Sequence, residues 1–274
     1  MRMIAALLTA MLAGAPAAAL AAPAGNALGV RPAADAALSG ETRTLVVGAD
    51  VFIGDLIKTG PKGQVQILFA DNTELVVGPS SALLIEDYLI RNDGSAGKLA
   101  VDMLSGAFRF ATGDSAKNRY TIGTPTGTIG VRGTEFDVWV DAQTKSSYVL
   151  RHGGTVEICS NAGECELLSD ICEVGKIAGI EAEVIGDSRL SKGELRQQLK
   201  SWFIYTDNQS PLLRQFWFPA ARECLNSSPV APAFPDTEDG LGEGGQIIDD
   251  QPGRSQTPPP PPPPPTGQSL TRGP

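Results

Sequence analysis

The sequence is poor in the residues from which most catalytic centres are built. Its 274 residues include one histidine, His152, which we interpret as a turn residue because Gly153 and Gly154 follow it. A single histidine without evident partners does not support a Ser-His-Asp triad, and no Gly-x-Ser-x-Gly motif is present. A Gly-x-x-x-x-Gly-Lys-Ser/Thr phosphate loop is also missing. The sequence therefore predicts no catalytic or cofactor-binding residues and no enzyme, although paired carboxylates for glycoside hydrolysis would leave no sequence signature.

Positive charge is also in short supply. The chain has 22 Lys and Arg against 31 Asp and Glu, for a formal net charge of −9. Such a surface repels phosphate backbones, so we expect no nucleic-acid partner. Much of the excess acid lies near the C-terminus, where we interpret it as a solvated tail, at Asp236, Glu238, Asp239, Glu243, Asp249 and Asp250.

Long hydrophobic runs are missing after residue 22. The run before it, IAALLTAMLAGAPAAAL, follows Arg2 and ends in the small-x-small pattern Ala19-Leu20-Ala21. These features predict a signal peptide over residues 1–21, cleaved between Ala21 and Ala22. An uncleaved anchor is the alternative, but the run is interrupted by glycine and proline and is shorter than the roughly 20 residues a membrane span needs. We expect an exported protein, periplasmic or extracellular, with no transmembrane segment in the mature chain.

Cysteine is scarce, and all of it lies in the second half of the chain, at Cys159, Cys165, Cys172 and Cys224. An even number in an exported chain favours two disulfides, for which three connectivities exist. A hairpin between TVEIC and ECELL would place Cys159 opposite Cys165, which leaves Cys172 to pair with Cys224 and to fasten the C-terminal part to the sheet. The spacings fit no common Cys-x2-Cys zinc pattern.

A metal site is not predicted elsewhere either. Asp71-Asn72-Thr73-Glu74 resembles a fragment of a calcium loop, but it lacks the spaced ligands and the glycine of such a loop. We interpret it as a hairpin turn.

What the sequence does contain, over residues 41–180, is a series of short β-like runs separated by Gly, Asn, Asp and Pro. GQVQILFA (63–70) alternates Val65, Ile67 and Phe69 with Gln64 and Gln66. Comparable runs are TELVVG (73–78), SALLIEDYLI (81–90), KLAVDML (98–104), GAFRFAT (106–112), RYTIGT (119–124), TEFDVWVD (134–141), SYVLRHG (147–153) and TVEICS (155–160). This spacing predicts an all-β sheet, barrel or solenoid of about ten or more short strands, and the lack of intervening helices argues against a βαβ arrangement.

The flanks differ in composition. Residues 22–40 are rich in Ala and Pro and predict a flexible leader. Residues 181–226 predict a helical segment, in which Asp187 or Ser188 caps a helix through RLSKGELRQQLKSWFIY and a shorter helix follows in PLLRQFWF. Its aromatic residues are expected to pack in a core. Residues 227–274 predict a disordered, acidic and Pro-rich tail, whose eight consecutive prolines favour a polyproline II spacer.

The backbone conformation of the segment TPTGTIGVRGTEF (124–136) can be inferred from its proline and glycines. Pro125 fixes φ and ends the strand at Thr124, and the glycines at 127, 130 and 133 permit positive φ or close backbone approach, which predicts tight turns or a bulge. Phe136, Val138 and Val140 then alternate with Glu135, Asp137 and Trp139, as in a half-buried strand. We expect the guanidinium of Arg132 to hold turn carbonyls or a carboxylate such as Glu135 or Asp137.

Two segments resemble the FecR family. They are GDLIKTGPKGQVQILFADNTELVVGPSSALLIEDY (54–88) and LSGAFRFATGDSAKNRYTIGTPTGTIGVRGTEFDVWV (104–140), and the similarity spans roughly Leu45 to Ile158. The resemblance implies a twisted β-solenoid or rolled sheet. In FecR-type regulators this is the periplasmic part, which receives a signal from an outer-membrane receptor, and one transmembrane helix joins it to a cytoplasmic segment that binds a sigma factor. Because only about 20 residues precede the leader, we expect no cytoplasmic sigma-binding segment and do not carry over anti-sigma activity.

Together these features predict an exported, non-catalytic protein-binding module for envelope signalling or assembly. We expect its partner to be an envelope protein, such as an outer-membrane receptor or a membrane regulator, bound by strand addition. The expected contact surface comprises exposed strand edges and the glycine-rich motif, with Thr124, Pro125, Gly127, Gly130, Arg132, Gly133, Thr134 and Phe136. The alternative is a structural or carbohydrate-contacting envelope protein, for which Trp139 is the candidate aromatic residue within the β-domain.

Overall fold

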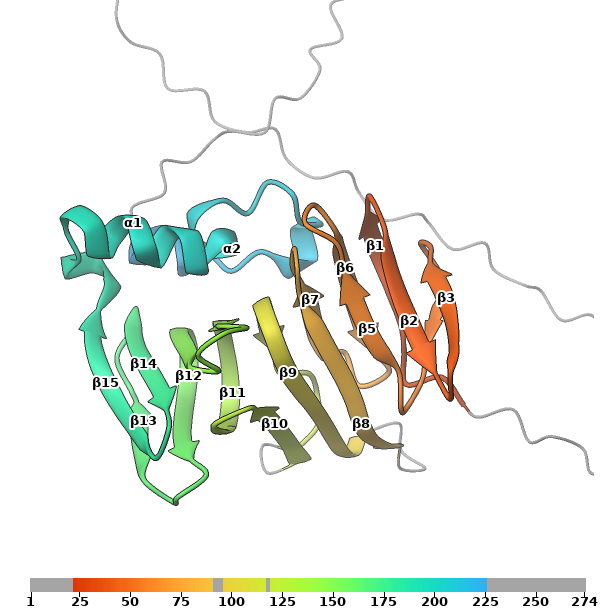
Figure 1. The fold of residues 1–274 in the computed structure, drawn as a ribbon, viewed down its shortest axis with the longest axis horizontal. Helices are drawn as coiled ribbons and strands as arrows, with labels where there is room; N and C mark the ends of the chain where they lie inside the picture. The colour runs from red at the N-terminus through yellow and green to blue at the C-terminus, as the bar shows by residue number, and fades with distance from the viewer. Residues whose placement is uncertain (1–21, 91–95, 117–118, 226–274) are drawn as a thin grey trace, which may run out of the picture. The chain divides into compact units, whose positions relative to one another are not determined.

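The chain folds as an all-β protein with a short helical C-terminal segment, as the sequence predicts. The computed structural model describes residues 22–90, 96–116 and 119–225, so the expected signal peptide and the expected tail lie outside the described residues. The strands are β1 (Gly25–Arg31), β2 (Ala34–Leu38), β3 (Glu41–Leu45), β4 (Asp50–Val51), β5 (Leu56–Thr59), β6 (Gln64–Phe69), β7 (Glu74–Val77), β8 (Ala82–Ile90), β9 (Ala96–Ala111), β10 (Tyr120–Thr124), β11 (Gly127–Val140), β12 (Ser147–Ser160), β13 (Cys165–Leu168), β14 (Glu173–Ala178) and β15 (Glu181–Asp187) (Figure 1).

These strands form one rolled sheet with two layers, because β9, β11 and β12 each pass from one layer to the other. Residues 106–111 of β9 pair with β7 and β11, whereas residues 96–105 pair with β8 and β10. The first layer therefore runs β15-β14-β12-β11-β9-β7-β6-β1-β4, and the second runs β13-β12-β11-β10-β9-β8-β5-β2-β3. Among the described residues, β9 and β10 form the one parallel pair, and the arrangement is a rolled sheet rather than a solenoid of parallel turns.

Glycines mark the places where the shared strands bend. Gly106 in β9 has φ +99°, and a Cβ at this position would lie 2.1 Å from the Ser81 hydroxyl oxygen. Gly133 in β11 and Gly154 in β12 have φ +66° and +68°, and the register between the two strands shifts there. Since such φ values favour glycine, the sequence places it where the sheet must turn. The predicted strands 98–104 and 106–112 are consequently one bent strand.

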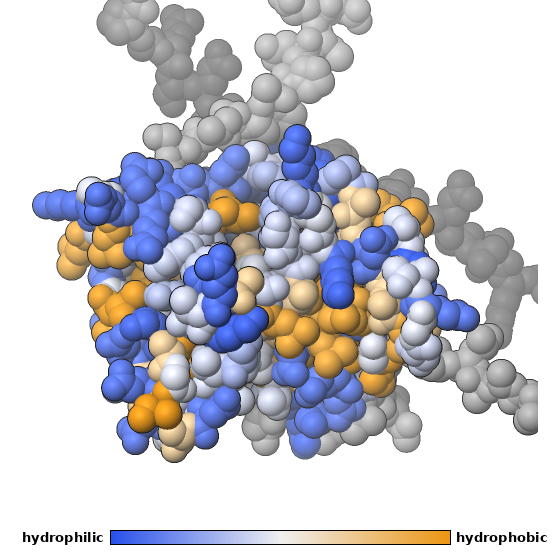
Figure 2. Space-filling view, in the orientation of Figure 1, coloured by the Kyte–Doolittle hydropathy of each residue, from blue (hydrophilic) through white to orange (hydrophobic). Residues whose placement is uncertain are grey.

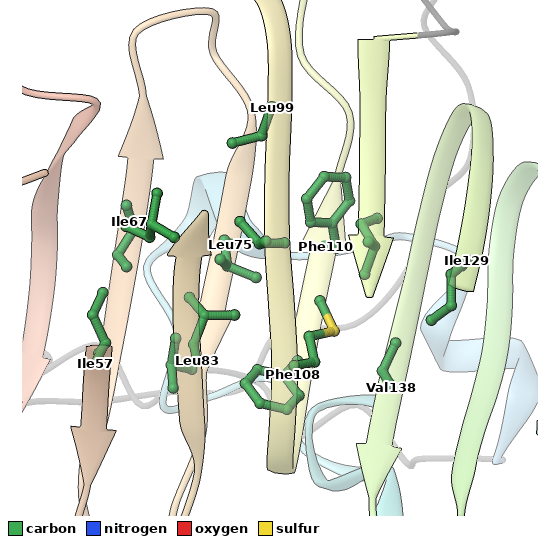
Figure 3. Close-up of a cluster of buried hydrophobic side chains, with 14 of the residues drawn as sticks. Ile57, Ile67, Leu75, Leu83, Leu99, Phe108, Phe110, Ile129 and Val138 are labelled. Atoms are coloured by element: carbon green, nitrogen blue, oxygen red, sulfur yellow. The ribbon is translucent and has the colours of Figure 1, made fainter. Parts of the chain in front are cut away.

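The core lies between the two layers (Figure 3). Ile67, Leu75 and Phe108 from the first layer meet Ile57 and Leu83 from the second, and all five side chains are fully buried or nearly so. The alternation in β6 is as predicted, because Val65, Ile67 and Phe69 point inward. Burial of this apolar surface is the main stabilising contribution to the fold.

The expectation of a flexible leader over residues 22–40 is wrong for residues 25–38, which form β1 and β2. Both strands are Ala- and Gly-rich, but their inward positions Ala27, Ala34 and Ala36 are completely buried or nearly so. β1 pairs with β6, and β2 pairs with β3 and β5, so neighbouring strands supply the order that local propensity lacks. The β-domain also extends past residue 180 through β15, which lies within the expected helical segment.

The C-terminal segment, residues 188–225, contains η2 (Ser188–Leu190), α1 (Gly193–Trp202), α2 (Ile204–Asp207), η3 (Arg214–Phe216) and α3 (Ala221–Cys224). Asp187 caps η2, where its carboxylate accepts a hydrogen bond from the Arg189 amide, and the α-helix begins later than expected. Leu199 is buried, but Leu190 and Leu195 are exposed. The segment runs from α1 near β15 and β14 to η3 near β7 (Figure 1).

Two disulfides join Cys159 to Cys165 and Cys172 to Cys224, which is the pairing that the sequence favours. The first crosses the hairpin between β12 and β13, where the two cysteines are direct register partners. The second joins the residue before β14 to the end of α3 and so attaches the C-terminal segment to the sheet.

Candidate functional site

The family motif forms the hairpin of β10 and β11. Pro125 and Thr126 make its turn, Thr124 pairs with Gly127, and the Thr124 hydroxyl donates to the Gly127 carbonyl at 3.1 Å. β10 is bonded to β9 on its other side, and β11 is bonded to β12. Since both strands have a neighbour on each side, strand addition along the motif, as expected from the sequence, is wrong. A partner would have to contact the face of these strands.

The motif glycines have different structural roles. A Cβ on Gly127 would lie 2.0 Å from the Cys159 carbonyl oxygen, so this position requires the close approach that only glycine allows. Gly133 belongs to the predicted bulge. Gly130, by contrast, has room for a Cβ, whose nearest neighbour would be a carboxylate oxygen of Glu157 at 3.6 Å. The structure therefore does not require glycine at position 130. Because glycine has no side chain, this position leaves a depression in the surface of the sheet.

Two of the expected contact residues belong to the interior. Phe136 is fully buried in the core, with its ring centroid 5.4 Å from that of Phe110. Thr134 is also buried, and its amide donates to the hydroxyl of Thr112 at 2.9 Å. Neither can contact a partner, so both have structural roles.

Arg132, which was expected to bond to the turn or to a carboxylate, is instead free of such contacts in the part of the chain that the structure describes. Its side chain is exposed, and within the described residues it makes no hydrogen bond or ion pair, so it holds neither a turn carbonyl nor Asp137. It borders an open groove of about 420 Å³ over Gly130, which Tyr120, Thr155, Glu157 and Leu167 also line. Glu157 is the register partner of both Gly130 and Leu167, and Leu167 is 51% exposed. We call Gly130, Arg132, Glu157 and Leu167 the motif face.

The motif face belongs to the outer side of the second layer, which no element of the described residues covers. A row of register partners crosses this side and contains Ala37, Leu56, Leu84, Asp102, Gly123, Thr128 and Cys159. None of these side chains is fully buried. Figure 2 shows an apolar area on the surface where Figure 1 has β5 and β8. The second layer thus presents an accessible face of mixed polarity.

Asp102 and Glu86 form a carboxyl pair on this uncovered side. Burial and a hydrogen bond with Glu86 raise the pKa of Asp102 to about 6. Gly123 lies directly opposite Asp102, and a Cβ at that position would lie 2.0 Å from a carboxylate oxygen of Asp102. Because Gly123 has no side chain, the carboxyl pair fits beside the motif hairpin.

The outer side of the first layer is instead covered by the C-terminal segment. Gln66 accepts a hydrogen bond from the Leu213 amide at 2.7 Å, and Gln64 accepts one from the Tyr205 hydroxyl at 3.0 Å. The row of register partners beneath the segment is Gly29, Gln66, Val76, Arg109, Asp137, Leu150 and Val174. The polar positions of β6, which alternation alone assigns to solvent, therefore bind a segment about 145 residues later in the chain.

Arg109 and Asp137 form a buried ion pair at the centre of this row. Both side chains are almost completely inaccessible, and the guanidinium donates two hydrogen bonds to the carboxylate. Arg109 also donates to the Gln209 side chain and lies over the Phe218 ring, 4.2 Å from its centroid. The prediction of a half-buried β11 is wrong here, because residues 206–218 cover its second face.

His152 belongs to the same cluster and is not a turn residue. It is buried within β12, with Nε2 at 3.0 Å from the Thr206 hydroxyl and 3.4 Å from an Asp137 carboxylate oxygen. Burial lowers the pKa of His152, so the imidazole is neutral near pH 7. Burial alone would raise the pKa of Asp137, but Arg109 and His152 outweigh it and hold that pKa below its usual value. The cluster is closed to solvent, and its geometry suits attachment of the segment rather than catalysis.

Trp139 lies in an aromatic cluster rather than alone. Its ring stacks on Trp202 of α1, with centroids 4.9 Å apart and planes 12° apart, and Tyr148 contacts both. The carbohydrate alternative needs a free indole face for sugar stacking, and one face of Trp139 is occupied by Trp202. The cluster contributes to attachment of α1.

Within the described residues, no group of three or more His, Cys, Asp and Glu side chains is placed to hold a metal ion. Across the same residues, no helix has both the length and the apolar character that a membrane crossing requires. Sequence reasoning missed Arg109, Thr206 and Gln209. Only Arg109 could have been found from the sequence, because a charged residue between Phe108 and Phe110 in a strand indicates a buried or paired charge.

The chain thus combines a rolled β-sheet, a motif hairpin with an open groove on its uncovered side, and a C-terminal segment that covers the other side. Residues 55–157 match the family model described as FecR protein, so this part of the chain is a FecR domain. The match contains the motif hairpin and all of the motif face except Leu167. The resemblance inferred from the sequence motifs is confirmed for these residues.

Two crystal structures of a "putative anti-sigma factor" from Parabacteroides distasonis are similar to the chain at 15% sequence identity, with TM-scores of 0.40 and 0.39. Each match covers 48% of this chain and 59% of the other, so less than two thirds of those proteins is represented. A search of curated proteins finds no match to the sequence.

Proposed function

We propose that the chain is an exported, non-catalytic protein-binding module that acts in envelope signalling or assembly through its FecR domain. The FecR match supports a regulatory role in signalling. Two disulfides support export, because such bonds persist mainly in oxidising compartments. The apolar run after Arg2 supports a cleaved signal peptide.

The observation that carries the proposal is the motif face. It combines an unpaired cation, Arg132, an exposed apolar residue, Leu167, and a shallow groove over Gly130, on the uncovered side of the sheet. An exposed apolar position beside charged groups in a groove is typical of a protein contact. We propose an envelope protein, such as an outer-membrane receptor or a membrane regulator, as the occupant.

Site-specific photocrosslinking in intact cells tests the proposal. A photoreactive phenylalanine derivative replaces exposed Thr128 in the motif strand of the full chain, and the matched control carries it at exposed Glu194 in α1. We expect an ultraviolet-dependent adduct with an envelope signalling protein from position 128 alone. Arg132→Glu in the same chain should abolish that adduct while leaving the melting temperature unchanged.

Identical adducts from positions 128 and 194, or an adduct that persists with Arg132→Glu, would contradict the proposed face. An adduct with a polysaccharide or its export machinery would contradict the signalling role and support the structural alternative.

A further inference from the structure

A second surface lies where the C-terminal segment meets the rim of the first layer. Two open cavities, of about 400 and 320 Å³, share Pro79 and Ile204 in their walls and therefore adjoin. The larger is lined also by Arg31, Lys62 and Lys200, and the smaller by Trp139 and Val140. We call this combined feature the crease. It is separate from the motif face, which belongs to the second layer.

The larger cavity is cationic in a chain of net charge −9. Arg31 ends β1 and Lys62 lies in the turn between β5 and β6; both are exposed, and within the described residues neither makes a side-chain hydrogen bond or ion pair. Lys200 is bonded to Asp207 at 2.6 Å, so that carboxylate, which also lines the cavity, is already neutralised. Two positive charges remain uncompensated at one end of the crease.

Backbone contacts place these two residues next to each other. Arg31 is the register partner of Gln64, two residues after Lys62. The Lys62 turn is closed by a hydrogen bond from the Gly63 amide to the Gly60 carbonyl at 2.9 Å, and a Cβ on Gly63 would lie 2.6 Å from the Ala33 carbonyl oxygen. The two cations thus project from neighbouring, hydrogen-bonded backbone positions, which concentrates their charge at one end of the crease.

The other end of the crease is apolar. Beyond Pro79 and Ile204 the walls are mainly apolar, with Val140, Ala107, Ala142 and the half-buried Trp139 beside Gly106, Ser80 and Ser201. An isolated small anion would use only the Arg31 and Lys62 end. A ligand that uses both cavities must be elongated, with negative charge at one end and apolar side chains at the other.

We propose that the crease binds an extended segment of a partner protein in which acidic residues adjoin an apolar one. The carboxylates lie at Arg31 and Lys62, and the apolar side chain lies over Pro79 and Ile204 toward Trp139. Recognition of acidic segments by clustered cations is an established mode of peptide binding. The crease then selects acidic partners that the overall negative charge of the chain would otherwise repel.

Calorimetric titration of the full chain with synthetic peptides tests this inference. The probe is acetyl-Leu-Gly-Asp-Glu-Asp-amide, and the matched probes replace either the acids by Asn-Gln-Asn or the leucine by serine. We expect the first peptide to bind, the neutral peptide not to bind, and the serine peptide to bind more weakly. Affinity should fall as salt rises from about 50 to about 300 mM, because the cations are exposed to screening.

The double variant Arg31→Ala/Lys62→Ala should bind the acidic peptide roughly tenfold more weakly, in keeping with two partly exposed charge contacts. Lys58→Ala, which removes an exposed cation on the outer side of β5, is the matched control and should bind as the unchanged chain does. Equal affinity for the acidic and neutral peptides, or equal affinity in the double variant, would overturn the inference. Displacement of the peptide by inorganic phosphate at similar concentration would show a simple anion site and would also overturn it.

Discussion

Arg109 and Asp137 face each other across β9 and β11 and form a two-pronged ion pair, with Nε 2.7 Å from one carboxylate oxygen and Nη2 2.8 Å from the other. The pair lies on the outer side of the first layer, and residues 206–218 close it from solvent through Thr206 and Gln209. A charged pair thereby replaces apolar packing at the place where the C-terminal segment meets the sheet. Its role is attachment in a single orientation, since each partner bonds specific groups of the segment.

Removing the carboxylate charge should be strongly destabilising. Asp137→Asn preserves the side-chain size but leaves the Arg109 guanidinium buried without a counter-charge, which we expect to lower the free energy of unfolding by about 3–5 kcal/mol. Denaturant titration followed by tryptophan fluorescence measures the loss. The double variant Arg109→Met/Asp137→Leu removes both charges and should lose much less; an equal loss would show that packing, rather than charge, dominates at this site.

The two disulfides should contribute unequally. Cys172–Cys224 spans 52 residues and Cys159–Cys165 spans 6, so chain entropy predicts contributions of about 4 and about 2 kcal/mol. We expect Cys172→Ala/Cys224→Ala to lower the melting temperature more than Cys159→Ala/Cys165→Ala does. Limited proteolysis should cut first within residues 188–225 only in the former variant. Protection of this segment in both variants would mean that the polar contacts alone hold it.

Stability should depend on pH through Asp102. Its pKa of about 6 in the folded protein exceeds the usual 3.8, so its contribution to stability is fully present below about pH 4 and is lost as the pH rises through 6. Asp102→Asn should therefore raise the free energy of unfolding at pH 8 by about 1 kcal/mol, a value discounted for solvent screening. At pH 4 the variant and the unchanged chain should unfold alike. A gain of the same size at both pH values would exclude titration of Asp102 as the cause.

Two glycines of the FecR domain provide a matched pair for the backbone argument. Gly154 has φ +68°, and its added Cβ would lie 2.0 Å from the Gly133 carbonyl oxygen, so Gly154→Ala should cost roughly 1–3 kcal/mol or more. Gly130 has room for a Cβ, and Gly130→Ala should change stability by less than about 0.5 kcal/mol. Thermal unfolding compares them. A large loss in Gly130→Ala would mean that position 130 constrains the fold and not only the groove.

The alternation of side chains made much of the core predictable. Val65, Ile67 and Phe69, and likewise Phe136 and Val138, point inward as the period of two requires. The same period assigned Asp137 and Gln66 to solvent, and there it failed. Their burial depends on Thr206 and Leu213, which are distant in the chain, and no local pattern encodes which sheet face a later segment will cover.

Two other features could not be predicted from the local sequence, for different reasons. Residues 25–38 lack β-branched residues apart from Val30, yet they form strands because β6 and β5 supply their hydrogen-bonding partners. The runs 98–104 and 106–112 predicted two strands, whereas the structure has one continuous strand that bends at Gly106, where φ is positive. The crease and the motif groove were unpredictable because each joins residues from several elements. For Arg132 the predicted bond to a turn carbonyl or carboxylate was wrong, because its exposed side chain makes no such bond within the described residues.

The bends at Gly106, Gly133 and Gly154 also affect how the sheet unfolds. Because β9, β11 and β12 each contribute hydrogen bonds to both layers, we expect loss of the ladders in one layer to destabilise those in the other. Amide protons in the two halves of each strand should therefore exchange with solvent together, as a single cooperative unit. A force applied to an edge strand of one layer is then transmitted through the backbone of the shared strands to the other layer. Both layers of the sheet therefore resist the force together.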